Sequence, residues 1–162
     1  MYQGEARIRS TPNGVSGTSP PKLATWNSGE YPSSGDVGSG GGMVLVADDE
    51  PANREVVRAM LHRVGFDVVT VEDGAAAVAR FREAPDAIRL VIVDLTMPHL
   101  GGDETFRRIR EIRPDVPIVV MSGYGQSEVS RRLGDGSLSA FLRKPFTTSG
   151  LLEVVWSVLG DA

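Results

Sequence analysis

The sequence of 162 residues contains no cysteine. Disulfide bonds, thiolate metal sites and cysteine nucleophiles are therefore excluded. No apolar stretch approaches the roughly twenty residues that a membrane-spanning helix requires, and the N-terminus lacks the charged and then apolar segments of a signal peptide. These absences predict a soluble, cytoplasmic domain that makes no membrane contact of its own, although a longer parent protein could be anchored in a membrane.

The chain also lacks an excess of basic charge. Its formal net charge is −4 and its pI is near 5.2, which argues against nonspecific binding to nucleic acid or to an anionic membrane. The arginines within 107–110 and 131–132 lie among acidic residues such as Glu104 and Asp135, as on solvated helix faces. We therefore expect no nucleic-acid partner. The hydrophobic content of 41% nevertheless suffices for one domain with a real core.

Residues 1–42 differ in composition from everything that follows, because glycine, proline and serine fill 20 of these 42 positions. A segment of this kind cannot bury enough apolar area to offset its chain entropy. We interpret residues 1–42 as a flexible linker or remnant and residues 43–162 as the folded domain.

From Met43 onward, short apolar runs alternate with stretches of helical periodicity. The predicted strands cover 44–47, 66–71, 89–94, 117–122 and 138–142, and the helices that follow them end near Gly65, Ala84, Ile112, Leu133 and Leu159. The helix over 126–133 is predicted to be weak, since glycines follow it. Strands that are continuously apolar and alternate with helices favour an α/β fold, with a parallel sheet covered on both faces.

Four of the predicted strands end on polar residues. The first runs into Asp48 and Asp49, the third into Asp94 and the fourth into Ser122, and the fifth is followed by Lys144. Because the carboxyl ends of parallel strands meet at one edge of a sheet, where ligands bind in such folds, we expect these side chains to lie together. Three carboxylates, a hydroxyl and an ammonium are suited to a divalent metal and a phosphoryl group.

Each of these residues also has an ordinary structural interpretation. Adjacent acids often cap a helix, an aspartate after a strand caps a turn, and a serine before a glycine makes one. Asp48, however, continues a buried strand, so its carboxylate costs several kcal/mol unless a cation or hydrogen bonds compensate it. The four endings together favour a reaction centre in which the Asp94 carboxylate is the nucleophile and becomes an aspartyl phosphate.

The sequence contains Val-Leu-Val-Ala-Asp48-Asp49-Glu, Val-Asp94-Leu-Thr-Met-Pro with a glycine close behind, Met-Ser122-Gly-Tyr and Phe-Leu-Arg-Lys144-Pro-Phe, in that order. Together these motifs closely resemble the receiver domain of two-component response regulators over residues 43–160. The resemblance implies a flavodoxin-like (βα)5 fold, a doubly wound five-stranded parallel sheet with strand order 2-1-3-4-5.

The same resemblance implies a role for each residue of the acidic site. Asp94 would accept a phosphoryl group from a phosphohistidine on a sensor histidine kinase or a histidine phosphotransfer protein. Asp48 and Asp49 would hold Mg²⁺, with Asp49 and Asp94 as direct ligands and the backbone carbonyl of Thr96 completing the protein ligands. Lys144 would pair with the phosphoryl oxygens.

The resemblance extends to the residues that would sense the phosphoryl group. The peptide bond before Pro145 would be cis, which aims the ammonium of the preceding lysine inward. Ser122 stands at the switch position, where its hydroxyl would bond a phosphoryl oxygen and draw its loop inward. Phe141 stands at the aromatic switch position, although a strand phenylalanine is also ordinary core. Thr96 and Tyr124 occupy positions where the family adjusts the lifetime of the phosphoryl group.

Two kinds of parent protein are open, a stand-alone receiver and a hybrid sensor histidine kinase with this domain at its C-terminus. No kinase domain is evident in the chain itself, and no output domain is expected after its last helix. Three features favour the hybrid kinase. They are the linker, the Met-Ser-Gly-Tyr-Gly turn with the break at 134–136, and a similarity of residues 4–14 to the closing strands of a kinase ATP-binding domain.

Outside phosphotransfer, the alternative function is a receiver-like interaction module that takes no phosphate. Degenerate receivers usually lose an acid or the lysine, and this chain keeps all of them. The short helix over 126–133 would make a poor dimerisation surface, so we expect a monomer that relays phosphate.

Overall fold

The computed structural model describes residues 42–134 and 139–160. Of the predicted linker, only Gly42 lies within these ranges, and the first residue of the predicted fifth strand, Leu138, lies outside them. The described residues form five strands and five helices in strict alternation, which confirms the predicted α/β order.

The elements follow the predicted bounds closely. In chain order they are β1 (Met43–Ala47), α1 (Pro51–Arg63), β2 (Asp67–Val71), α2 (Gly74–Glu83), β3 (Ile88–Asp94), α3 (Gly102–Ile112), β4 (Ile118–Ser122), α4 (Gln126–Leu133), β5 (Ala140–Arg143) and α5 (Thr148–Gly160). Local signals account for several of these boundaries. Asp73 caps α2 by accepting a hydrogen bond from the backbone N–H of Ala76, and α4 ends before Gly134, whose φ is +82°.

The fifth strand differs from its prediction, because it begins at Ala140 and continues to Arg143. Ser139 lies outside the strand, and its hydroxyl accepts hydrogen bonds from the backbone N–H of Ile118 and from the Arg110 guanidinium. Arg143 pairs with Ser122 at the other end of the strand. The strand therefore reaches one residue closer to Lys144 than the apolar run indicated.

The sheet has the order β2-β1-β3-β4-β5, and every neighbouring pair is parallel, as the resemblance implied. The register places the strand ends side by side. Ala47 pairs with Val93, so the residues that follow them, Asp48 and Asp94, emerge at the same level. On the other side of β3, β4 ends at Ser122, level with the last residue of β5.

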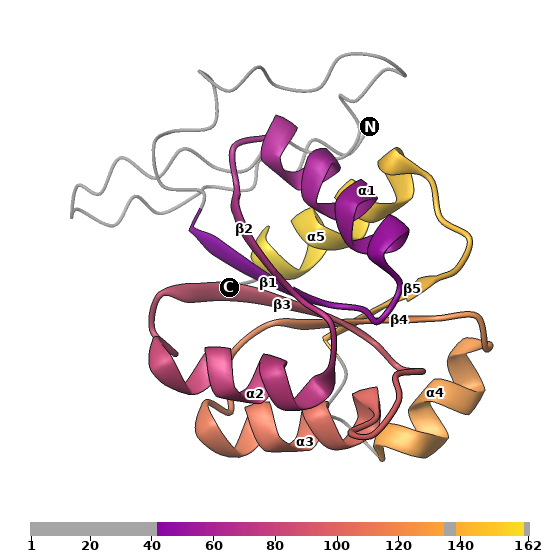
Figure 1. The fold of residues 1–162 in the computed structure, drawn as a ribbon. Helices are drawn as coiled ribbons and strands as arrows, with labels where there is room; N and C mark the ends of the chain where they lie inside the picture. The colour runs from indigo at the N-terminus through magenta and orange to yellow at the C-terminus, as the bar shows by residue number, and fades with distance from the viewer. Residues whose placement is uncertain (1–41, 135–138, 161–162) are drawn as a thin grey trace, which may run out of the picture.

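Helices cover both faces of the sheet (Figure 1). Helices α1 and α5 lie on one face, and α2, α3 and α4 lie on the other. The two cores meet the sheet through alternate residues of the same strands: Leu45 and Val91 belong to one core, and Val46 and Ile92 to the other. Burial on both faces explains why the strands are continuously apolar. Among the described helices, none is long and apolar enough to cross a membrane.

Candidate functional site

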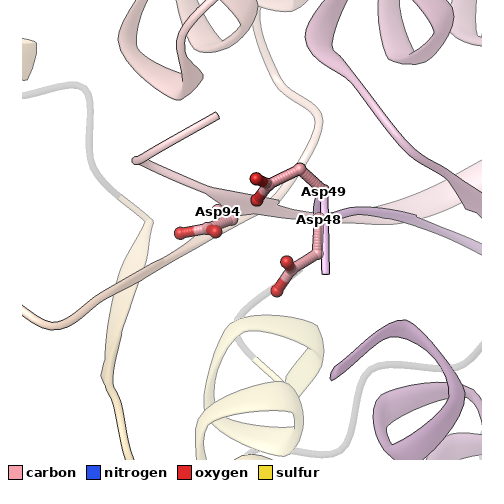
Figure 2. Close-up of side chains that lie close together, drawn as sticks. All are labelled: Asp48, Asp49 and Asp94. Carbon is pink, nitrogen blue, oxygen red and sulfur yellow. The ribbon is translucent and has the colours of Figure 1, made fainter. Parts of the chain in front are cut away.

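Three aspartates from two strand ends come together at the carboxyl edge of the sheet (Figure 2). Asp48 and Asp49 follow β1, and Asp94 ends β3. Each offers a carboxylate oxygen, and these three oxygens lie within 4.8 Å of one another. Asp48 is fully buried and Asp94 is 5% exposed, whereas Asp49 is exposed. The expected convergence of these acids is therefore present.

Lys144 joins the two buried aspartates. Its Nζ lies 2.9 Å from Oδ2 of Asp48 and 3.1 Å from Oδ2 of Asp94. The peptide bond from Lys144 to Pro145 is cis, as predicted, and the backbone N–H of Lys144 donates to the carbonyl of Ser122 at 2.9 Å. The lysine side chain, 22% exposed, is thus held between the aspartates instead of extending into solvent.

The remaining oxygens of the two buried carboxylates accept backbone hydrogen bonds. Oδ1 of Asp48 accepts from the N–H of Glu50 at 2.9 Å, and Oδ1 of Asp94 accepts from the N–H of Thr96 at 3.3 Å. Asp49 differs, since its carboxylate makes no hydrogen bond or ion pair within 42–134 and 139–160. Over the same ranges the carbonyl oxygen of Thr96 accepts no hydrogen bond. Both oxygen donors are thus available to a cation.

The pKa values of the site show how its charges balance. Burial raises the pKa of the Asp94 carboxyl above its usual value, the Lys144 ammonium opposes that rise, and the charge of Asp48 adds to it. For Lys144, burial acts to lower the pKa, but the hydrogen bond to Asp48 and the charges of both aspartates together raise it. One ammonium therefore serves two buried carboxylates and leaves negative charge that a divalent cation would offset.

The ordinary interpretation of the adjacent acids is wrong for Asp49. The N-cap of α1 is Glu50, which makes no side-chain capping bond. For Asp94 and Ser122 the ordinary contacts do exist: Asp94 accepts from the turn at Thr96, and the Ser122 hydroxyl accepts from the N–H of Tyr124 at 3.0 Å. For Asp94 the turn contact occurs together with the charged contact to Lys144, so a turn-forming role does not exclude a chemical one.

Of the residues expected at the two switch positions, Ser122 ends β4 and Phe141 lies within β5. Ser122 is fully buried, Tyr124 is 47% exposed, and Phe141 is partly buried against the core beneath α2, α3 and α4. Within the described residues, no hydrogen bond joins the Ser122 hydroxyl to Asp94 or Lys144. His62 and His99 are both exposed.

Two neighbours of the site were not predicted from the sequence. Arg54, in the first turn of α1, donates from its guanidinium to the carbonyl of Asp48 at 2.6 Å. The sequence signal that could have identified Arg54 is its position in the first turn of a helix, where a cation is unfavourable because it opposes the helix dipole. Gly102 packs against β3 so closely that a Cβ there would lie 2.2 Å from the carbonyl oxygen of Asp94. No local pattern marks this contact, because it depends on how α3 packs on the sheet.

The chain is a doubly wound α/β domain with an acidic site, suited to a metal ion and a phosphoryl group, at the carboxyl edge of its sheet. Comparisons with known proteins identify its family. The profile of the response regulator receiver domain matches residues 44–156, and the chain belongs to that family. It is accordingly a phosphoacceptor switch domain of two-component systems. Domains of this family bind Mg²⁺ at an acidic pocket, and this chain has the corresponding aspartate cluster.

Relatives of two architectures resemble the chain to a similar degree. Response regulator RR06 of Streptococcus pneumoniae is 33% identical over 116 residues, which cover 72% of this chain and 52% of that protein. Sensor kinase CckA of Brucella abortus is 32% identical over 122 residues, covering 75% of this chain and 13% of that protein. The chain therefore spans only part of the length of either relative.

Among solved structures, a response regulator receiver domain protein from Clostridium thermocellum matches with a TM-score of 0.69 at 26% identity, over 74% of this chain and 95% of that chain. Nothing in these comparisons favours a receiver-like module that takes no phosphate.

Proposed function

We propose that Asp94 is the residue that accepts the phosphoryl group. A carboxylate oxygen of Asp94 attacks phosphorus, the P–N bond of a donor phosphohistidine breaks, and the electron pair of that bond returns to the imidazole nitrogen. The product is an acyl phosphate on Asp94. The observation that carries this assignment is that, of the two buried carboxylates beside the Lys144 ammonium, Asp94 keeps some exposure, 5% against 0% for Asp48, and lies beside the unpaired Asp49.

Lys144 and Ser122 would act on the transferred group. The Lys144 ammonium, 3.1 Å from Oδ2 of Asp94, is placed to neutralise charge on phosphoryl oxygens. Ser122 accepts a hydrogen bond from Tyr124, so its own O–H proton remains available to a phosphoryl oxygen. Bonding that oxygen would draw the loop after β4 inward, and Phe141 would follow as the aromatic switch.

The donor set of the site fits Mg²⁺. Asp49 and Asp94 would be direct ligands, the carbonyl of Thr96 a third, and Asp48 would support them from the buried side. When bound, the ion would orient the donor and offset charge in phosphoryl transfer. The free Asp49 carboxylate supports this assignment, and so does the raised pKa of Asp94, because Lys144 alone does not offset the cost of burying the ionised Asp94 carboxylate.

Intact mass after incubation with acetyl phosphate and Mg²⁺ tests the proposal. The wild type should gain one phosphoryl group, and Asp94→Ala should gain none. Asp86→Ala, which removes an exposed aspartate from the loop between α2 and β3, is the matched control and should behave as wild type. Absence of added mass in the wild type, or undiminished labelling of Asp94→Ala, would contradict the mechanism.

We further propose that the donor is a sensor histidine kinase or a histidine phosphotransfer protein and that the domain is a monomer. Helix α4 has only eight residues, which supports the expectation of a poor dimerisation surface. A shift to dimer in gel filtration after treatment with beryllium fluoride would contradict the monomer. The hybrid-kinase parent stays a prediction, because response regulators and sensor kinases resemble this chain about equally.

A further inference from the structure

Tyr124, two residues after the switch serine, has an aromatic contact with the last turn of α4. The Cζ atom of Arg132 lies 4.8 Å from the centroid of the Tyr124 ring, which is a cation–π geometry. Tyr124 is one of two large hydrophobic residues that are substantially exposed in the described part of the chain. The stacking thus orders a ring that would otherwise extend freely into solvent.

The arginine side of this contact is held in place. Nε of Arg132 donates to Glu128 at 3.1 Å, and the carbonyl of Arg132 accepts from the guanidinium of Arg107 on α3 at 3.2 Å. Helix α4 is itself anchored by Val129 and Leu133, which are buried in the core. Arg132 is therefore fixed relative to α3 and the sheet.

The tyrosine side belongs to the loop that carries the switch serine. The hydrogen bond from the Tyr124 N–H to the Ser122 hydroxyl closes a tight turn, so the two residues move as a unit. A displacement of the Ser122 hydroxyl toward Asp94 that keeps this hydrogen bond moves Tyr124 relative to α4. Because Arg132 is anchored, that displacement weakens the stacking.

We propose that Arg132 is a positioning residue that holds Tyr124, and through it Ser122, in the arrangement seen here and so opposes capture of the phosphoryl group by the loop. This inference rests on the proposed function, because it requires that Ser122 moves toward a phosphoryl oxygen. An exposed cation–π contact of about 0.5 to 1 kcal/mol corresponds to an affinity factor of about two to five.

The chain supplies a matched control in Arg131. Arg131 and Arg132 both pair with Glu128, but only Arg132 stacks on Tyr124. Arg131→Gln and Arg132→Gln each remove one pairing to the same glutamate, and only the second removes the stacking. A difference between them therefore reports on Tyr124 and not on the charge of α4.

The experiment measures the apparent Kd of beryllium fluoride in the presence of Mg²⁺ for the full chain, by amide chemical shifts. Arg132→Gln should bind about two to five times more tightly than wild type, and Arg131→Gln should match wild type. The Arg132→Gln effect should persist in a Tyr124→Phe background, where the ring remains, and disappear in Tyr124→Leu.

Equal affinities for Arg131→Gln and Arg132→Gln, a weaker affinity for Arg132→Gln, or a gain that persists in Tyr124→Leu would overturn the proposal. These results differ from failure of the proposed function. In that case the wild type itself would neither bind beryllium fluoride nor take a phosphoryl group from acetyl phosphate.

Discussion

The two halves of the site are held by different forces. On the acid side, Asp48, Asp94 and Lys144 are held by charged contacts of 2.9 and 3.1 Å between largely buried groups, and the exposed Asp49 lies beside them. On the switch side, the Ser122 hydroxyl is held by one neutral hydrogen bond, the Tyr124 ring by exposed stacking, and Phe141 by partial burial against the core.

This difference indicates which half can respond to a phosphoryl group. Contacts between buried charges cost several kcal/mol to break, whereas a neutral hydrogen bond or an exposed cation–π contact contributes about 1 kcal/mol. A single new bond to a phosphoryl oxygen can therefore rearrange the switch side and leave the acid side in place. The folded structure thus fixes the positions of the acid-side residues, whereas a phosphoryl group can change the arrangement of the loop after β4.

The largest expected effect comes from removing the shared cation of the acid side. Lys144→Met leaves Asp48 buried without a countercharge, so the free energy of unfolding in EDTA should fall by about 3 kcal/mol. Mg²⁺ should restore part of this loss. Urea unfolding with and without Mg²⁺ measures both, and Arg143→Met, which changes the exposed preceding residue, is the control. A loss no greater than the control's would show that Asp48 is compensated by other groups.

A pair of glycine substitutions compares the two halves directly. In Gly102→Ala the new Cβ would lie 2.2 Å from the carbonyl oxygen of Asp94 and 2.5 Å from Cα of Leu95, so the free energy of unfolding should fall by about 1 to 3 kcal/mol. Gly123→Ala, beside Ser122, meets nothing within 4 Å and should be neutral or slightly stabilising. Thermal unfolding distinguishes them. Equal destabilisation of both variants would show that Gly102 and Gly123 are packed equally closely.

Mg²⁺ should stabilise the folded protein through ligands on the acid side alone. At Mg²⁺ concentrations of about 10 to 100 times Kd, the free energy of unfolding should rise by about 1.4 to 2.7 kcal/mol, because the ion binds only the folded protein. Asp49→Asn should lose most of this gain, and Asp67→Asn, at the opposite edge of the sheet, should keep it. Differential scanning calorimetry in Mg²⁺ and in EDTA gives the comparison. An undiminished gain in Asp49→Asn would remove this residue from the ligand set.

The smallest expected effect is a pH dependence due to Asp94. Burial raises the pKa of Asp94 in the folded protein above the ordinary value of 3.8, so the folded state binds this proton more tightly than the unfolded chain does. The associated stability is present below the ordinary pKa and is lost as the pH rises through the raised folded pKa. In EDTA, the stability of wild type relative to Asp94→Asn should therefore decline over that window. Urea unfolding at a series of pH values measures this difference. If the free energies of unfolding of the two proteins changed with pH in the same way, the raised pKa of Asp94 would be contradicted.

Much of this domain could be predicted because its signals are local. Continuously apolar runs mark the strands, Asp73 marks a helix start and Gly134 marks a helix end. The cis bond before Pro145 was predicted by resemblance and is present. The start of β5 differs from the prediction at Ser139, which belongs to the apolar run in the sequence. In the structure Ser139 precedes the strand, and its hydroxyl accepts hydrogen bonds from Ile118 and Arg110.

By itself the sequence determined which residues end the strands and, through the parallel order that alternating strands and helices require, that those ends share one edge. Only the tertiary structure decided that Lys144, 96 residues from Asp48, bridges both buried aspartates, that Gly102 must lack a side chain, and that Arg132 stacks on Tyr124. The physical reason is that periodicity and turn chemistry act between near neighbours in the chain. Ion pairs, close packing and stacking depend instead on strand register and on how each helix lies on the sheet.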